Sequence, residues 1–244
     1  MDERDLRGLL HQVKAGRMSR RAFVRRLTTV GLTAPMATQL LALSGVAMAQ
    51  PKSSYKPTRR GGGGLLKVLW WQGPTLLNPH FAVGTKDQDG SRLFYEPLAR
   101  WDRDGNLQPV LAETIPGRED GTLAADGKSV TWKLKKGVKW HDGQPLTADD
   151  VVFTWAYARD PATATLTSGS YKDVTVEKID QYAVVVKFQE ATPFWADAFV
   201  AAAGCIMPRH LFADYAGARS REAPTNLKPA GTEPHKFKDF KPGD

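Results

Sequence analysis

Few residues of this sequence have the types and spacing that catalysis requires. His141 and Asp142 are neighbours and could form a catalytic pair, but no Gly-x-Ser-x-Gly motif supplies a nucleophile for the pair to activate. Gly143 follows them, and an Asp-Gly dipeptide is typical of a turn. The single cysteine, Cys205, excludes an internal disulfide framework and any multi-cysteine zinc or iron–sulfur site. We therefore expect no catalytic centre, no bound metal and no other cofactor.

Two stretches resemble ligand-binding loops, and each lacks a required feature. Residues 121–129 have five residues between two glycines, where a phosphate-binding loop needs four, and they lead into a predicted strand instead of a helix. Residues 102–113 imitate a calcium-binding loop with Asp102, Asp104 and Glu113, but the required glycine at the sixth position is Leu107. We predict turns rich in Asp and Gly at both places.

The positive charge of the chain is concentrated near its N-terminus. Residues 1–49 carry eight basic and three acidic side chains, and so supply +5 of the formal net charge of +8. Residues 50–244 are close to charge balance, so we expect no nucleic acid as a partner. With 41% hydrophobic and 25% charged residues, the chain has a globular composition, and residues 50–244 are enough to bury a core.

Residues 1–49 are typical of a signal peptide for twin-arginine export. An apolar segment at 27–48 ends in the small-x-small cleavage site formed by Ala47 and Ala49. The export motif that precedes it is Ser19, Arg20, Arg21 and Phe23. We predict passage through the twin-arginine export machinery, cleavage after Ala49 and a periplasmic location. A retained membrane anchor is the alternative, and Pro35 and several polar residues that interrupt the apolar segment argue against it.

The rest of the chain divides into a linker and a folded body. Residues 50–63 are rich in Pro, Ser and Gly and are predicted to be a flexible linker. In the body, 64–244, helices and strands are mixed without strict alternation, which favours an α/β sandwich of mixed sheets. The predicted elements are strands at 65–72, 130–134, 174–176 and 183–188, and helices at 91–101, from Thr147 to 158, after Thr192 and after Pro208.

Val130, Trp132 and Leu134 alternate with polar residues, so their side chains are expected to face one core. Val151 and Trp155 lie on the apolar stripe of the helix that begins at Thr147, and we expect them to pack against that strand.

The segment 136–153, Lys-Gly-Val-Lys-Trp-His-Asp-Gly-Gln-Pro-Leu-Thr-Ala-Asp-Asp-Val-Val-Phe, closely resembles the most recognisable part of the family 5 extracellular solute-binding proteins. Shorter matches at 63–68, 77–80, 95–98 and 105–113 follow the family's order. The resemblance covers about 64–244. It implies a periplasmic-binding-protein-like fold of type II, which is α/β with mixed sheets.

Two features of this sequence differ from the family's pattern. Where members usually read Gly-Thr-Gly-Pro-Tyr, this chain has Glu233 and His235 in the sequence Gly-Thr-Glu-Pro-His. Family members also continue considerably further and build a second lobe, which encloses the ligand with the first. We therefore expect the first lobe only, as an apparently truncated N-terminal part.

The resemblance implies the substrate-binding component of a peptide-type ABC importer, which captures a small peptide or similar solute without catalysis. The solute is then delivered to an ABC permease in the inner membrane. The expected ligand-binding residues lie at the end of the first predicted strand and in the loop after it, and are Trp71, Gln72, Asn78 and His80. Two alternatives remain open: a non-functional or split fragment of such a protein, and an exported enzyme.

Overall fold

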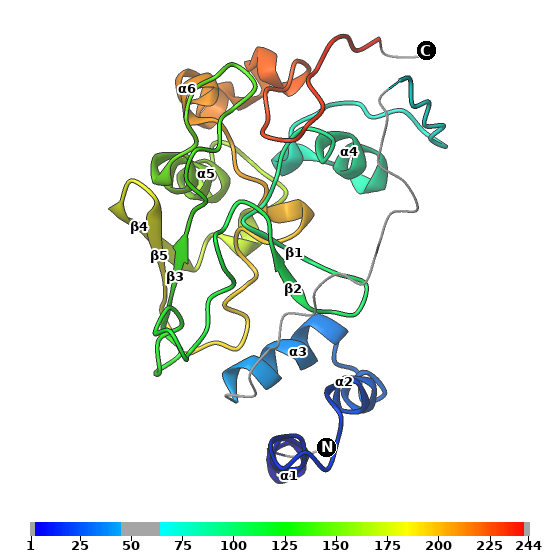
Figure 1. Cartoon of the computed structure of the whole chain (residues 1–244). Helices are drawn as coiled ribbons and strands as arrows, with labels where there is room; N and C mark the ends of the chain where they lie inside the picture. Colours follow the sequence, from blue (N-terminus) through cyan, green and yellow to red (C-terminus); the bar gives the residue numbers. More distant parts are fainter. Residues whose placement is uncertain (1–2, 45–63, 242–244) are drawn as a thin grey trace.

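The computed structural model describes residues 3–44 and 64–241. A three-stranded antiparallel sheet of order β3-β5-β4 forms one side of the body (Figure 1), with β3 at Ser129–Lys133, β4 at Val174–Asp180 and β5 at Ala183–Phe188. Helix α5, Ala148–Arg159, lies against β4 and β5. The structure confirms the predicted strand at 130–134 and the predicted hairpin, which turns where the Tyr182 amide donates to Asp180.

The start of α5 follows from local side-chain chemistry. The hydroxyl of Thr147 accepts a hydrogen bond from the Asp149 amide at 3.3 Å, and the Asp150 carboxylate accepts one from the Thr147 amide at 2.9 Å. This reciprocal pair is the capping box that the sequence predicts. The helix ends before Pro161, which cannot continue it.

The core lies between this sheet and α5. Val130, Trp132, Leu134 and Val151 are buried in one cluster, as predicted. Trp155 is only partly buried at the edge of that cluster, where its indole nitrogen donates to the Val174 carbonyl at 2.9 Å and Arg159 covers its outer face. The prediction for the core is therefore confirmed for four residues, and Trp155 packs at its rim.

A second, two-stranded antiparallel sheet joins β1, Ala99–Trp101, to β2, Leu107–Pro109. One Asp102 carboxylate oxygen accepts hydrogen bonds from the amides of Asp104 and Asn106, each at 2.9 Å. The residues that imitate a calcium loop thus form a turn, as expected.

Several predicted elements are wrong. Residues 65–72 form no strand, and residues 91–101 form no helix: they contain only the last residue of α4, Gly84–Ser91, then a turn and β1. Pro97 cannot occupy a helix interior, and the Leu98 amide donates to the Phe199 carbonyl, so this stretch follows a long-range partner. No helix follows Thr192, whose hydroxyl closes a local turn with the Phe194 amide. The helix predicted after Pro208 is present as α6, Arg209–Phe212.

Beyond α6, the chain continues in short 3₁₀ helices. These helices are η4 at Ala213–Tyr215, η5 at Gly217–Glu222 and η6 at Pro224–Asn226. Gly217 begins η5 with a φ of 69°.

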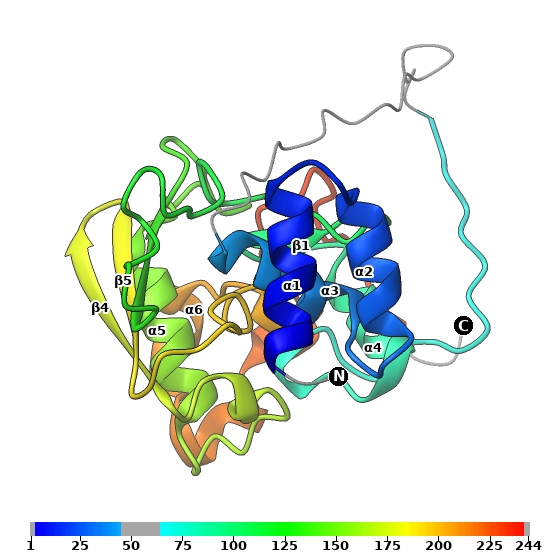
Figure 2. The same cartoon turned by 90° about the horizontal axis from the view of Figure 1, so that it is seen from below.

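The N-terminal residues form three helices that pack on one another beneath the β1–β2 sheet (Figures 1 and 2). They are α1 at Glu3–Lys14, α2 at Arg20–Thr28 and α3 at Ala34–Leu43. Within 3–44 and 64–241, no helix combines the length and apolar character needed to cross a membrane. The predicted cleavage residues Ala47 and Ala49, and the linker 50–63, lie outside the described residues.

Candidate ligand-binding site

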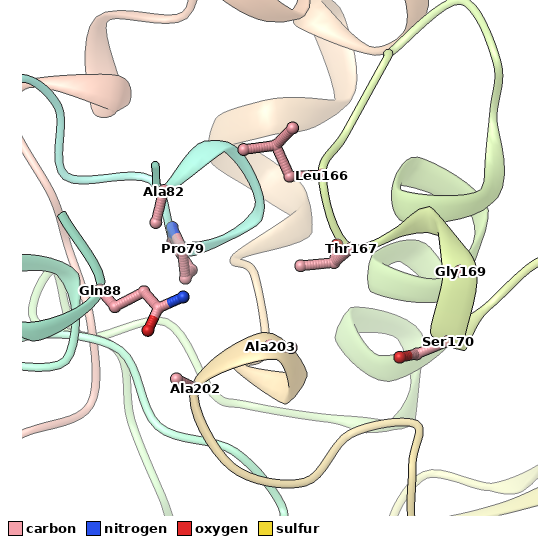
Figure 3. A pocket seen from close by; sticks show the side chains of 9 residues that line it. All are labelled: Pro79, Ala82, Gln88, Leu166, Thr167, Gly169, Ser170, Ala202 and Ala203. Carbon is pink, nitrogen blue, oxygen red and sulfur yellow. The ribbon is translucent and has the colours of Figure 1, made fainter. Parts of the chain in front are cut away.

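Four short segments from three separate regions of the sequence surround an open depression of about 230 Å³ (Figure 3). They are η1 at Pro79–Phe81, the helix α4, the region of η2 at Ser168–Ser170 and η3 at Ala202–Gly204. The lining residues are Pro79, Ala82, Gln88, Leu166, Thr167, Gly169, Ser170, Ala202 and Ala203.

The lining of this depression is uncharged and mostly small. Its polar side chains are Gln88, Thr167 and Ser170, and much of the remaining wall is alanine, glycine and proline. Small side chains let a ligand approach the backbone closely, and neutral hydrogen-bonding groups match peptide bonds better than they match ions. In the described parts of the chain, no group of three or more His, Cys, Asp or Glu side chains is placed to hold a metal ion.

His80 is buried behind the wall of this depression and is hydrogen-bonded to the lining residue Thr167. Its side chain is fully buried, with Nδ1 2.7 Å from the Thr167 hydroxyl and Nε2 2.9 Å from the Cys205 carbonyl oxygen. Because a carbonyl only accepts, Nε2 carries the proton and Nδ1 accepts from Thr167. Burial lowers the pKa of His80 to about 4, although the hydrogen bond to Cys205 opposes this shift. The imidazole is therefore neutral at physiological pH and holds one wall in place.

Asn78 fixes the start of η1, which carries Pro79 and His80. Its side-chain oxygen accepts from the His80 amide at 3.0 Å. Its side-chain nitrogen donates to Asn226 at 2.8 Å and to the Tyr157 hydroxyl at 3.3 Å. Asn78 is fully buried, so these bonds satisfy polar atoms that water cannot reach. Its position makes it a support of the depression instead of part of its lining.

Asp87 holds the segment that presents Gln88. Its carboxylate accepts hydrogen bonds from the Thr75 amide at 2.6 Å, the Val83 amide at 3.1 Å and the Lys86 ammonium at 2.7 Å. Burial alone would raise the pKa of Asp87, but these bonds, with the one from Lys86 first among them, hold it below its ordinary value. The charged carboxylate thus anchors both ends of the loop before α4.

The η3 side of the depression has a strained backbone. Phe199 and Ala201 have φ of 63° and 59°, and Ala201 combines this with ψ of −158°, a region nearly restricted to glycine. At Gly204, an added Cβ would lie 2.2 Å from the Phe199 carbonyl carbon, so only glycine fits. Tyr171 braces this wall, because its hydroxyl donates to the Ala203 carbonyl at 3.2 Å. Strain of this kind is frequently found where a backbone is shaped for a ligand.

The structure separates the four predicted ligand-binding residues into two pairs. Asn78 and His80 are buried on either side of Pro79, which lines the depression, whereas Trp71 and Gln72 lie in the exposed segment 65–72 and do not line it. Sequence reasoning missed Gln88, Thr167 and the small residues around them. The signal that pointed to this place was the position of Asn78 and His80 after the first predicted strand, within the family match at 77–80.

Comparisons of the sequence and of the structure with known proteins all find bacterial solute-binding proteins. Residues 106–244 match the family model described as bacterial extracellular solute-binding proteins, family 5 Middle. Oligopeptide-binding protein AppA of Bacillus subtilis is 35% identical over 195 residues, which are 79% of this chain and 34% of that protein. The structure of Bacillus subtilis AppA in complex with a nonapeptide matches with a TM-score of 0.62 and 32% identity, over 70% of this chain and 33% of that one.

A further solved structure, NikZ of Campylobacter jejuni in complex with Ni(L-His), matches with a TM-score of 0.58 and 25% identity, over 69% of this chain and 32% of that one. The mixed helix and sheet architecture is that of the type II periplasmic binding proteins. Within that class, the chain belongs to the bacterial extracellular solute-binding proteins of family 5. It spans about a third of the length of AppA and 24% of that of the Escherichia coli oligopeptide-binding protein OppA.

Proposed function

We propose that this chain contributes the peptide-contacting wall of a periplasmic substrate-binding component of a peptide-type ABC importer, and that it acts without catalysis. The observation that carries the proposal is the uncharged depression of Figure 3, which occurs in a family 5 chain. Neutral polar groups and accessible backbone recognise the repeating part of any peptide, so this wall suits ligands of varied sequence. The partners are a short peptide and an inner-membrane ABC permease.

The depression is open on one side, so a bound peptide would be buried by this chain on one face only. The entropic cost of holding a peptide remains the same, while much of the desolvation is absent. We therefore expect this chain alone to bind peptides weakly, with a Kd on the order of millimolar. Asn78 and His80 would position the wall. Trp71 and Gln72 would contact the ligand only when further polypeptide of the family fold is present.

A second surface supports the idea of a larger assembly. The segment 65–72 makes no backbone hydrogen bond within the described residues. Its exposed apolar side chains are Leu65, Leu66, Val68, Leu69, Trp70 and Trp71. Apolar residues on both faces are typical of a strand that is buried in a sheet. We propose that further polypeptide of the family fold pairs with this segment, because the relatives are about three times as long as the match.

The proposed organisation of the chain is a twin-arginine signal peptide at 1–49, a linker at 50–63 and the ligand-binding lobe at 64–244. Export rests on the motif at 19–23 and on the small residues Ala47 and Ala49. Replacing Arg20 and Arg21 by Lys should retain the precursor in the cytoplasm, because the paired guanidinium groups are read as an address. Sequencing the N-terminus of the mature protein should give Gln50.

Peptide binding can be tested at the depression itself by NMR titration of the ¹⁵N-labelled chain with a nonapeptide. We expect saturable shifts at the amides of Ala82, Thr167 and Ala202. Gly169→Leu should abolish them, because a Cβ at Gly169 meets no atom within 4 Å and the added side chain can enter the depression without disturbing the fold.

Gly117→Leu is the matched control, because a Cβ there makes only ordinary contacts, the nearest at 3.9 Å, and Gly117 does not line the depression. This variant should bind as the unmodified chain does. Absence of saturable shifts, or equal binding by the Gly169→Leu variant, would overturn the proposed site. Micromolar binding by the chain alone would contradict the argument that burial is one-sided.

A further inference from the structure

The N-terminal helices hide part of the export motif. Phe23 is fully buried, although an exported chain must present its motif to a receptor. It belongs to one buried cluster with residues of the two neighbouring helices: Leu9 and Val13 of α1, and Ala37 and Leu41 of α3. Figure 2 shows α1 and α2 side by side with α3 behind them. A receptor that reads the side chains of α2 therefore cannot reach Phe23 while α1 occupies this position.

The folded body holds the other side of the motif. The guanidinium of Arg21 lies 3.3 Å from the carboxylate of Asp104, in the turn between β1 and β2. In the same turn, a Cβ at Gly105 would lie 3.5 Å from the Thr38 hydroxyl and 3.8 Å from the Ala34 side chain of α3. The ion pair is exposed and weak on its own. The packing of α3 on Gly105 nevertheless keeps Arg21 next to the body.

The connection between α1 and α2 allows the cover to move. Gly16 has φ of 69°, which is strained for other residues, and it separates α1 from the Ser19 cap of α2. Helix α1 has 12 residues, a length at which an isolated helix is marginal in water. Its position therefore depends on tertiary contacts, of which those of Leu9 and Val13 are the most buried, and rotation about Gly16 would release it without unfolding α2.

We propose that α1 is an autoinhibitory cover, which closes over Phe23 in the folded precursor and must lift before the export receptor can bind. This inference rests on the proposed twin-arginine export. It gives residues 1–18 a role that the export motif itself does not require. Export would then be limited by the fraction of precursor molecules in which α1 is open.

The test is a pulse–chase measurement of export of the full-length precursor in cells. In the opening variant, Leu9→Asp with Val13→Asp, carboxylates replace the two buried contacts of α1. We expect this variant to be exported several-fold faster than the unmodified precursor. In the control, Gly8→Asp with Gln12→Asp, the same two charges are added at exposed positions of the same helix. The control should be exported at the unmodified rate.

A second measurement tests the position of α1 on the purified precursor, without relying on export. Hydrogen exchange of the purified precursor should show lower amide protection in α1 for the opening variant than for the control, because the released helix is marginal on its own. Equal or slower export by the opening variant would refute the proposal that α1 is a cover, and so would unchanged amide protection of α1. Arg20→Lys with Arg21→Lys separates this failure from that of the export proposal, because efficient export of that variant would refute the twin-arginine route itself.

Discussion

The buried imidazole of His80 should make the stability of this protein depend on pH in a way that one substitution removes. Burial lowers the pKa of His80 from 6.5 to about 4 in the folded state. Because the folded pKa lies below the unfolded one, the unfolded chain binds the proton more readily. The contribution of neutral His80 to the stability of the folded state is fully present above about pH 6.5 and is lost as the pH falls towards about 4. Between about pH 7 and pH 5, this one group should reduce the free energy of unfolding by about 2 kcal/mol.

His80→Gln is the perturbation, because glutamine keeps a donor for the Cys205 carbonyl and does not titrate. With its amide nitrogen bonded to Cys205, glutamine has no acceptor at the position of Nδ1, and loss of the hydrogen bond from the Thr167 hydroxyl should cost about 1–2 kcal/mol at neutral pH. The unmodified protein should therefore be more stable near neutrality, and the two should become similar near pH 5. All other titrating groups are common to both proteins and cancel in the difference.

Urea unfolding at a series of pH values, followed by tryptophan fluorescence, measures this difference. The signal reports on the body, because Trp132 and Trp195 are buried in its core. Curves of unfolding free energy against pH that remain parallel for the two proteins would refute the reasoning, since His80 would then titrate alike in the folded and unfolded states. A variant that is equally stable at neutral pH would show that the bond to Thr167 contributes nothing.

Three further predictions concern the backbone and can be checked by thermal or urea unfolding. Thr147→Ala should lower stability by about 1 kcal/mol, because it removes half of the capping box of α5. Ala201→Gly should raise stability by about 1 kcal/mol by relieving its positive φ, and a decrease would show that the backbone there is unstrained. Gly231→Ala should be severely destabilising, since its Cβ would lie 1.7 Å from the Phe94 carbonyl oxygen; native-like stability would mean that this contact opens at little cost.

The elements that could be predicted from the sequence are those whose cause is local. The capping box of Thr147 and Asp150 spans four residues, and the alternation of Val130, Trp132 and Leu134 lies within one strand. A resemblance over 136–153 supplied the fold class. Each of these signals can be recognised without knowing which distant segment lies opposite.

The parts that could not be predicted depend on partners far away in sequence. Residues 91–101 have helical spacing, but the Leu98 amide bonds to Phe199 and Ala99 lies beside Val200. The depression presents the same difficulty, because its lining comes from three separate regions of the sequence and consists mostly of small residues, which give no periodic pattern. Of the residues expected to bind ligand, Asn78 and His80 lie close to the depression, because Asn78 caps η1 and His80 belongs to it, and η1 forms part of the wall.

Cys205, whose carbonyl oxygen accepts the hydrogen bond of His80, also carries a side chain that bears on the oxidation chemistry of this protein. The thiol is fully buried, and burial raises its pKa to about 12. At neutral pH the reactive thiolate is then on the order of 10⁻⁵ of the population. Outside the cytoplasm, where oxidants favour disulfides, the protein would remain free of intermolecular cross-links. For the same reason, a cysteine introduced at an exposed position could be labelled selectively without first replacing Cys205.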